Sequence, residues 1–171
     1  MKKILILISL IIGGLVMAQS DRIILELKDG KVVIETRSDL APLHVKRIKE
    51  LVSSGFYEGL KFHRVIDGFM AQTGDPDGNG TGGSGQNIPA EFSVEKHLRG
   101  TVSMARAQDP NSADSQFFIC FQDSTFLDGQ YTVWGSVVEG MEYVDKIKRG
   151  APGSGTVSDP DRIVRMYIEA E

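Results

Sequence analysis

The fold class is decided by the stretch Ile23-Ile24-Leu25-Glu26-Leu27-Lys28-Asp29-Gly30-Lys31-Val32-Val33-Ile34-Glu35-Thr36-Arg37. Two runs rich in β-branched and apolar residues, 23–28 and 31–37, flank the dipeptide Asp29-Gly30. Asp-Gly between two such runs is typical of a tight β-hairpin, because both residues tolerate the backbone angles that the turn requires. The sequence therefore predicts an antiparallel pair of strands here.

A helix is predicted directly after this hairpin, from Pro42 to Ser53. Proline suits the first helical turn, where its missing N–H has no partner to lose. The apolar residues that follow keep helical spacing, and Gly55 then ends the helix as its C′ residue. These apolar residues are Leu43, Ile48, Leu51 and Val52.

The rest of the chain consists mostly of short extended runs separated by clusters of turn residues. A second short helix fits 139–148, with Met141, Val144 and Ile147 on one face. Short strands without crossover helices favour an antiparallel sheet, and about eight of them can close into a barrel filled by side chains. We therefore expect a mainly β fold, a closed eight-stranded antiparallel β-barrel capped by two α-helices. The six further strands are predicted at 61–66, 69–72, 101–105, 116–121, 131–138 and 162–170.

Two segments do not fit this strand pattern. The first, 74–85, contains six glycines, and the second, 108–115, is polar with one proline. Loops on a rigid scaffold commonly carry binding surfaces, so both are candidate parts of a binding site.

The first eighteen residues have the pattern of a secretory signal peptide. A basic start is followed by a mostly apolar run from Ile4 to Val16, and Ala18 precedes the expected cleavage before Gln19. A buried strand or an uncleaved membrane anchor is the alternative, but a bilayer-spanning helix needs about 20 apolar residues. We expect residues 1–18 to be removed, leaving a single domain of residues 19–171 in the periplasm or secreted, with no membrane span.

Composition excludes several classes of partner and chemistry. The formal net charge is −4 and would become −6 without Lys2 and Lys3. An acidic chain without a basic run is a poor binder of nucleic acid or anionic membranes. Cys120 is the only cysteine, so no internal disulfide can form, and the apolar run around it predicts a buried, inert thiol.

Catalytic and ligand-binding motifs of the common enzyme classes are missing. The three histidines and one cysteine have no metal-site spacing, so neither a metal nor a cofactor is expected. The phosphate-binding loop motif and the nucleophile-elbow motif are both absent. His97, next to Lys96, is expected to be solvated.

Arg64 is the most unusual residue of the predicted strand 61–66. Alternation in a strand would place Phe62 and Arg64 on one face and His63 and Val65 on the other. An arginine on an apolar face can be a surface residue in a salt bridge. Alternatively, its guanidinium lies over an apolar pocket, where it can grip a carbonyl group with two donors.

Segment 62–75, Phe-His-Arg-Val-Ile-Asp-Gly-Phe-Met-Ala-Gln-Thr-Gly-Asp, resembles the signature F-H-R-x-x-x-x-F-x-x-Q-x-G-D of the cyclophilins. Further blocks that match the family follow in order at 79–83, 103–107, 115–119 and 126–129. The resemblance spans the chain after residue 18. It implies an eight-stranded barrel with two helices, a proline-binding groove on its outer face, and peptidyl-prolyl cis-trans isomerase activity.

The resemblance also implies roles for individual residues. Arg64 matches the catalytic arginine of the family. Taken alone, Phe118 and Leu127 would be ordinary core residues, and Gln72 and Gln116 surface residues. The proline pocket is matched by Phe69, Met70, Phe118 and Leu127, with further pocket positions at Phe126 and Tyr131, and the substrate backbone or adjoining groove is matched by Gln72, Ala105, Arg106 and Gln116.

Three positions depart from the pattern of many eukaryotic cyclophilins. Phe126 replaces a tryptophan, Tyr131 replaces a histidine, and Ala105-Arg106 replaces Ala-Asn. These residues are similar to the bacterial branch of the family. Because the tryptophan position matters for cyclosporin binding, weak binding of that drug is expected. Trp134 is expected to pack in the core.

Rotation about an X–Pro bond needs no nucleophile, because no bond is made or broken. The barrier of about 18–20 kcal/mol reflects the amide resonance lost in the twisted state. We therefore expect an isomerase that acts on proline-containing segments of unfolded or flexible proteins, and nothing in the sequence demands more than a monomer. Two alternatives are a chaperone that holds such segments without turnover and a hollow barrel that carries a small ligand.

Overall fold

The computed structural model describes residues 21–170, so the predicted signal peptide lies outside the described residues. Eight strands form one sheet in which every pair of neighbours is antiparallel, in the order β3-β4-β6-β5-β7-β2-β1-β8. The mainly β, antiparallel prediction is confirmed. The strands are β1 Arg22–Leu27, β2 Gly30–Thr36, β3 Arg64–Ile66, β4 Met70–Thr73, β5 Thr101–Met104, β6 Phe117–Cys120, β7 Val133–Glu139 and β8 Arg165–Ile168.

The sheet is an open half-barrel, so the prediction of a closed barrel is wrong. Its edge strands β3 and β8 do not pair with each other. Isolated contacts span the gap instead: a single bridge joins Lys61 to Arg162, and the backbone N–H of Phe62 donates to the Asp161 carbonyl at 2.9 Å. Segment 150–163, which faces 59–63 here, contains three glycines and two prolines: Gly150, Gly153, Gly155, Pro152 and Pro160. Such residues interrupt a regular ladder.

The N-terminal hairpin and the first helix form where they were predicted, but the hairpin turn lies one residue earlier than the expected Asp29-Gly30. In the hairpin, β1 and β2 pair from Arg22 with Glu35 to Leu27 with Gly30, so the turn itself is Lys28-Asp29. The helix α1 spans Pro42–Ser53. Gly55 follows with a φ of +73°, a left-handed conformation that glycine adopts without strain.

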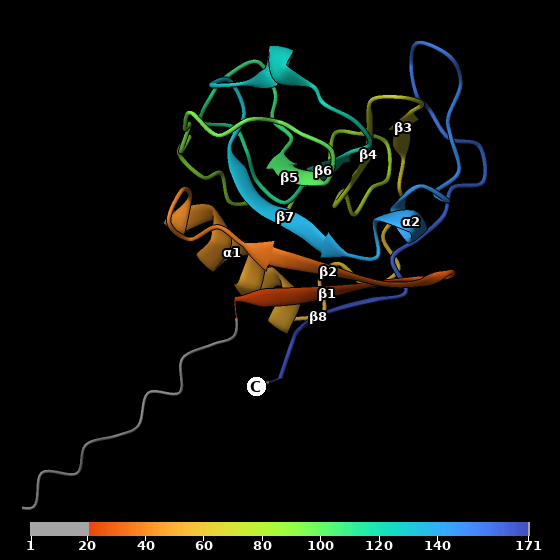
Figure 1. Cartoon of the computed structure of the whole chain (residues 1–171), viewed down its shortest axis with the longest axis horizontal. Helices are drawn as coiled ribbons and strands as arrows, with labels where there is room; N and C mark the ends of the chain where they lie inside the picture. The colour runs from red at the N-terminus through yellow and green to blue at the C-terminus, as the bar shows by residue number, and fades with distance from the viewer. Residues whose placement is uncertain (1–20, 171) are drawn as a thin grey trace, which may run out of the picture.

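The second helix is shorter than the prediction of 139–148. It spans Met141–Val144 as α2, because β7 continues through Glu139 and Gly140 turns the chain. Beyond Val144 the backbone tightens into bonds between residues three apart, such as Ile147 N–H to the Val144 carbonyl. Figure 1 shows α1 and α2 toward opposite ends of the sheet, and Val45 of α1 and Val144 of α2 belong to the same core.

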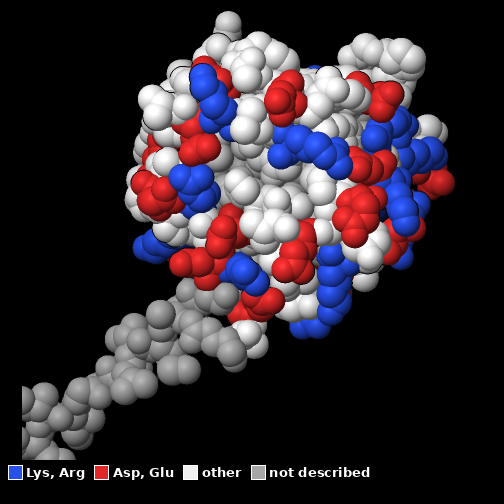
Figure 2. All heavy atoms as spheres, in the orientation of Figure 1, with Lys and Arg blue, Asp and Glu red and all other residues white. Residues whose placement is uncertain are grey.

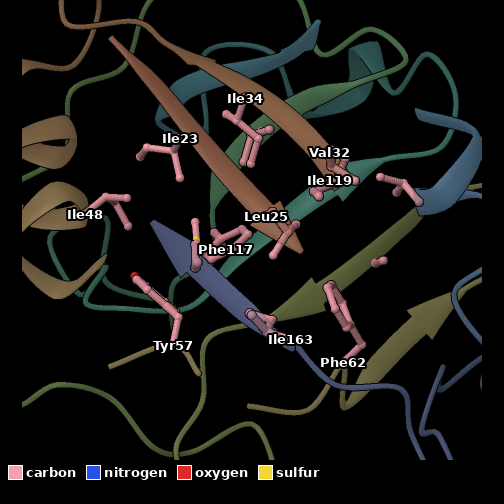
Figure 3. Close-up of a cluster of buried hydrophobic side chains, with 14 of the residues drawn as sticks. Ile23, Leu25, Val32, Ile34, Ile48, Tyr57, Phe62, Phe117, Ile119 and Ile163 are labelled. Carbon is pink, nitrogen blue, oxygen red and sulfur yellow. The ribbon is translucent and has the colours of Figure 1, made fainter. Parts of the chain in front are cut away.

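The main core fills the concave side of the sheet and is closed by α1. Phe117 of β6 lies at its centre, in edge-to-face contact with Tyr57 and Trp134 at centroid distances of 5.5 and 5.4 Å. All three side chains are fully buried, which confirms that Trp134 packs in the core. Figure 3 shows Phe117 and Tyr57 among aliphatic side chains from β1, β2 and α1, including Ile23, Ile34 and Ile48.

Across residues 21–170, no helix has the length and apolar character needed to cross a membrane.

Candidate functional site

The site is built on the outer face of strands β3, β4 and β6. Arg64 pairs with Gln72 across β3 and β4, and Gln72 pairs with Phe118 across β4 and β6. Because directly paired residues of neighbouring strands project to the same face, these three side chains form one row. Their neighbours in sequence, such as Ala71 and Ile119, project into the main core.

A second, smaller apolar cluster lies beneath this row. Its buried members are Met70, Phe118, Cys120 and Leu127, and the partly buried Phe69, Tyr131, Ala105 and Ile66 pack against it. Leu127 comes from η1, a 3₁₀ turn spanning Thr125–Leu127. The thiol of Cys120 lies in this cluster, and burial raises its pKa to about 12. The prediction of a buried cysteine is confirmed.

A cavity of about 600 Å³ opens over this cluster. Ten of the eleven residues singled out from the sequence line it, and the eleventh, Gln116, lines an adjoining cavity of about 230 Å³ together with Gln72, Ala105 and Arg106. The structure therefore brings all eleven residues together. The ten are Arg64, Phe69, Met70, Gln72, Ala105, Arg106, Phe118, Phe126, Leu127 and Tyr131.

The predicted alternation of residues 61–66 is wrong before Arg64. Phe62 is fully buried in the main core, whereas His63 and Arg64 both line the outer cavity. The reason is that β3 begins only at Arg64, so residues 62 and 63 do not follow strand alternation. Arg64 therefore does not share a face with Phe62. Its apolar neighbours come from β4, β6 and η1 instead.

A chain of hydrogen bonds fixes the Arg64 guanidinium at the cavity. Its Nη1 donates to Gln72 Oε1 at 3.2 Å, and its Nε donates to the Ser154 carbonyl at 3.3 Å. Gln72 Nε2 in turn donates to Gln116 Oε1 at 2.9 Å. Gln116 Nε2 completes the chain by donating to the carbonyls of Gly80 and Gly82 at 3.1 and 2.8 Å. The glycine-rich loop therefore helps to orient Arg64.

The carboxylate of Asp75 holds this glycine-rich loop in place. It is almost completely buried and accepts hydrogen bonds from the backbone N–H groups of Asp77, Asn79 and Gly80. Burial raises the pKa of Asp75, but these hydrogen bonds outweigh it and hold the pKa below its ordinary value. Gly74 precedes it because a Cβ there would lie 2.9 Å from the Cα of Gln116.

Arg106 closes the opposite side of the cavity. Its Nε and Nη2 donate to the Gln130 carbonyl at 3.1 and 3.0 Å, and its Nη1 donates to the carbonyls of Ala107 and Gln108. The guanidinium also stacks 4.7 Å from the ring centroid of Tyr131. Tyr131 meets Phe118 edge to face, so Arg106 stabilises the aromatic wall.

His97 supports the site from behind, and the prediction that it is solvated is wrong. The side chain is fully buried and stacks on Phe118 with ring centroids 6.2 Å apart. Its Nε2 lies 3.0 Å from Ser103 Oγ, and its backbone N–H donates to Asp128, which directly follows η1. His97 thereby links β5 to the turn that carries Phe126 and Leu127. The neighbouring Lys96 gave no indication of this burial.

Outside the glycine-rich loop, five cavity residues were not identified from the sequence as site residues: Lys61, His63, Thr156, Val157 and Pro160. His63 is buried, and burial lowers its pKa. Lys61 lines the cavity one position before the buried Phe62. Both lie outside the regular strand, so no periodic pattern could indicate them. Within the described range 21–170, no cluster of His, Cys, Asp or Glu could hold a metal ion.

Comparisons with known proteins agree with this geometry. A family model described as cyclophilin-type peptidyl-prolyl cis-trans isomerase/CLD matches residues 22–168. A probable peptidyl-prolyl cis-trans isomerase of Brucella abortus is 57% identical over 162 residues, covering 87% of this chain and 83% of that protein. A peptidyl-prolyl cis-trans isomerase of Helicobacter pylori is 46% identical over 125 residues, covering 71% of this chain and 76% of the relative.

Solved structures of the same family are also similar. A cyclophilin from Hirschia baltica has a TM-score of 0.77 at 29% identity, covering 87% of this chain and 74% of its own. A cyclophilin-type isomerase from Cryptosporidium parvum, crystallised in the presence of the dipeptide Ala-Pro, has a TM-score of 0.79 at 29% identity, covering 88% of this chain and 99% of its own. This chain belongs to the cyclophilin-type peptidyl-prolyl cis-trans isomerases.

Proposed function

We propose that Arg64 accelerates X–Pro isomerisation by donating a hydrogen bond to the proline nitrogen of the twisted amide. The observation that carries this proposal is the environment of the guanidinium. Gln72 Oε1 and the Ser154 carbonyl, both neutral, hold its Nη1 and Nε. Among residues 21–170, its Nη2 has no hydrogen-bond acceptor, so this group is available to a bound peptide.

The chemistry of the reaction explains why one donor is enough. Twisting the amide removes its resonance and leaves the proline nitrogen as an amine-like acceptor. A planar amide offers no such lone pair, so a donor placed there binds the transition state more tightly than either ground state. The apolar floor beside Arg64 strengthens this interaction by excluding water.

The proline ring is expected to pack on the floor formed by Met70, Phe118 and Leu127. These side chains are almost completely buried, whereas Phe126 at the rim is 66% exposed and contacts Phe69 at a centroid distance of 5.4 Å. A buried floor with an exposed rim suits a ring that must stay fixed while the preceding carbonyl rotates. The Ala-Pro dipeptide in the Cryptosporidium parvum crystals supports a proline-centred ligand.

A peptide assay tests this mechanism. The wild-type protein should interconvert the isomers of an Ala-Pro test peptide faster than the uncatalysed tens to hundreds of seconds. Arg64→Ala should lose about 2–4 kcal/mol of transition-state stabilisation, as other preorganised donors do. The matched control is Arg165→Ala, on the exposed edge strand β8. A wild-type rate no faster than the uncatalysed one would favour a holding chaperone instead.

We further propose that the protein acts on exported proteins as they fold in the periplasm. This proposal rests on the basic, apolar and small-residue pattern of residues 1–18. N-terminal sequencing of the protein from the cell envelope should give Gln19 as the first residue. Retention of Met1 would contradict cleavage.

Weak binding of cyclosporin is proposed from Phe126, which occupies the tryptophan position of sensitive relatives. Phe126→Trp should strengthen inhibition by the drug, because the larger ring extends the exposed rim of the cavity. An inhibition titration of both proteins measures this. Equal inhibition of the two would show that another residue limits binding.

A further inference from the structure

Among residues 21–170, the 600 Å³ cavity is lined by cationic side chains and by no carboxylate. Lys61, Arg64 and Arg106 are among its lining residues, and neither aspartate nor glutamate is. This differs from the rest of the molecule. The chain carries a formal net charge of −4, and Figure 2 shows acidic and basic side chains interspersed over the face that it presents.

The three cations at the cavity also differ from most other Lys and Arg side chains in forming no ion pair. Ten of the seventeen Lys and Arg side chains in residues 21–170 lie within 4.0 Å of a carboxylate, but none of the three at the cavity does. Arg64 and Arg106 donate only to neutral oxygens. Within the part of the chain that the structure describes, no carboxylate therefore neutralises their positive charges.

Lys61 is the least constrained of the three. Its backbone bridges to Arg162, and its side chain lies along the glycine-rich loop, where a Cβ on Gly78 would come within 2.9 Å of its Cδ. The Asp75 carboxylate accepts backbone N–H groups of the same loop, and within residues 21–170 no ion pair joins it to Lys61. Within the described part of the chain, the Lys61 ammonium has no hydrogen-bond or ion-pair partner.

We propose that this cavity prefers X–Pro segments that carry aspartate or glutamate within a few residues of the proline, and that Lys61 is the side chain that sets this preference. The inference rests on the proposed function, since it names the substrate class of the same site. An acidic substrate side chain would supply the counter-charge that the protein lacks here. A basic substrate would add to an unneutralised positive field and bind less well.

The expected size of the preference follows from the exposure of the cavity. Ion pairs in contact with water are individually weak, and salt screens them. We therefore expect kcat/KM for a glutamate peptide to exceed that for its glutamine counterpart by about three- to tenfold at low ionic strength. The ratio should approach one as the salt concentration is raised to about 1 M, where the screening length is about 3 Å.

Peptide series with matched sequences test this preference. Glu, Gln or Lys is placed at each of the two positions before the proline and the two after it in an otherwise neutral Ala-Pro peptide. The Glu/Gln ratio of kcat/KM is measured for the wild type, Lys61→Gln and Lys61→Glu. The control is Lys46→Gln, on α1, because Lys46 also forms no ion pair within residues 21–170 but lies outside this cavity.

We expect a ratio above about three in the wild type and in Lys46→Gln, a clearly lower ratio in Lys61→Gln, and a still lower one in Lys61→Glu, where Arg64 and Arg106 remain positive. A wild-type ratio near one at every position would overturn it. A ratio that survives Lys61→Gln would overturn the assignment to Lys61. Using ratios within each protein cancels any change in overall activity. Failure to accelerate even the Gln peptides would instead count against the proposed function.

Discussion

Phe117 and Phe118 are neighbours on β6, yet they belong to two different regions of the molecule. Phe117 projects into the main core, between Tyr57 and Trp134. Phe118 projects to the outer face, where it is only 5% exposed but forms the floor of an open cavity. The inner face is covered by a helix and by other strands, whereas the outer face is covered only by loops and η1. Strand alternation alone therefore builds a core and a binding site from one segment.

The largest expected effects separate these two phenylalanines. Phe117→Ala should lower the free energy of unfolding by about 3–5 kcal/mol, because it leaves a cavity in a closed core. Phe118→Ala should cost less stability, because water can enter from the open side. Its kcat/KM should fall by more than about tenfold, since the proline ring loses its main apolar contact.

Urea unfolding and peptide isomerisation, measured on both variants, check this pair. Activity should be corrected for the folded fraction, so that instability is not mistaken for a catalytic defect. Equal losses of kcat/KM after that correction would contradict the division between the two faces.

A smaller effect is expected from Gln116, which links the glycine-rich loop to Gln72 and Arg64. Gln116→Ala should reduce kcat/KM about two- to tenfold, the contribution of one hydrogen bond or slightly more. Because the guanidinium loses orientation, kcat should change more than KM. The matched control is Gln122→Ala, an exposed residue outside the cavity. An unchanged kcat with a raised KM would show that Gln116 only holds the substrate.

Acid should weaken the protein through its buried histidines. Burial lowers the pKa of His44, His63 and His97 below the ordinary 6.5. As the pH falls below 6.5, these histidines bind protons more readily in the unfolded chain than in the folded protein. Their contribution to the free energy of unfolding is therefore fully present above pH 6.5 and decreases as the pH falls below it. Urea unfolding between pH 8 and pH 5 measures the decline, and His63→Gln should make it shallower.

The same series separates the cavity histidine from the structural ones. His44 and His97 contact the carboxylates of Glu91 and Asp128, whereas His63 lines the cavity beside Arg64. A pH dependence identical in wild type and His63→Gln would show that His63 is protonated equally well in both states.

Local features of the fold could be predicted from the sequence, and nonlocal ones could not. The β1–β2 hairpin and α1 depend on residues close in sequence, Asp29-Gly30 and Pro42 to Gly55, and both form. Closure of the barrel depends on how residues 59–63 meet residues 150–163. No periodic pattern in the sequence predicts how these two segments contact each other, and they are joined only by isolated bridges and hydrogen bonds.

In the candidate site too, features that depend on nonlocal contacts could not be predicted from the sequence. Residues 117–120 are all buried, so burial periodicity cannot tell the core face from the cavity floor. Only the family motifs placed Phe118 beside Arg64. His63 and Lys61 were missed because β3 begins at Arg64 and the residues before it leave the strand pattern. His97 was misjudged because its burial depends on Asp128, 31 residues away in the sequence, and on Ser103 of β5, neither of which the local pattern around Lys96 could indicate.

The central claim is that Arg64 acts on the twisted amide and contributes little to holding the planar peptide. Exchange NMR of a bound Ala-Pro peptide separates these roles, since it gives the isomerisation rate on the protein and the Kd independently. For Arg64→Ala, the account predicts an on-protein rate lower by about 30- to 1000-fold, the equivalent of about 2–4 kcal/mol, with Kd changed far less. A weakened Kd with an unchanged on-protein rate would contradict it.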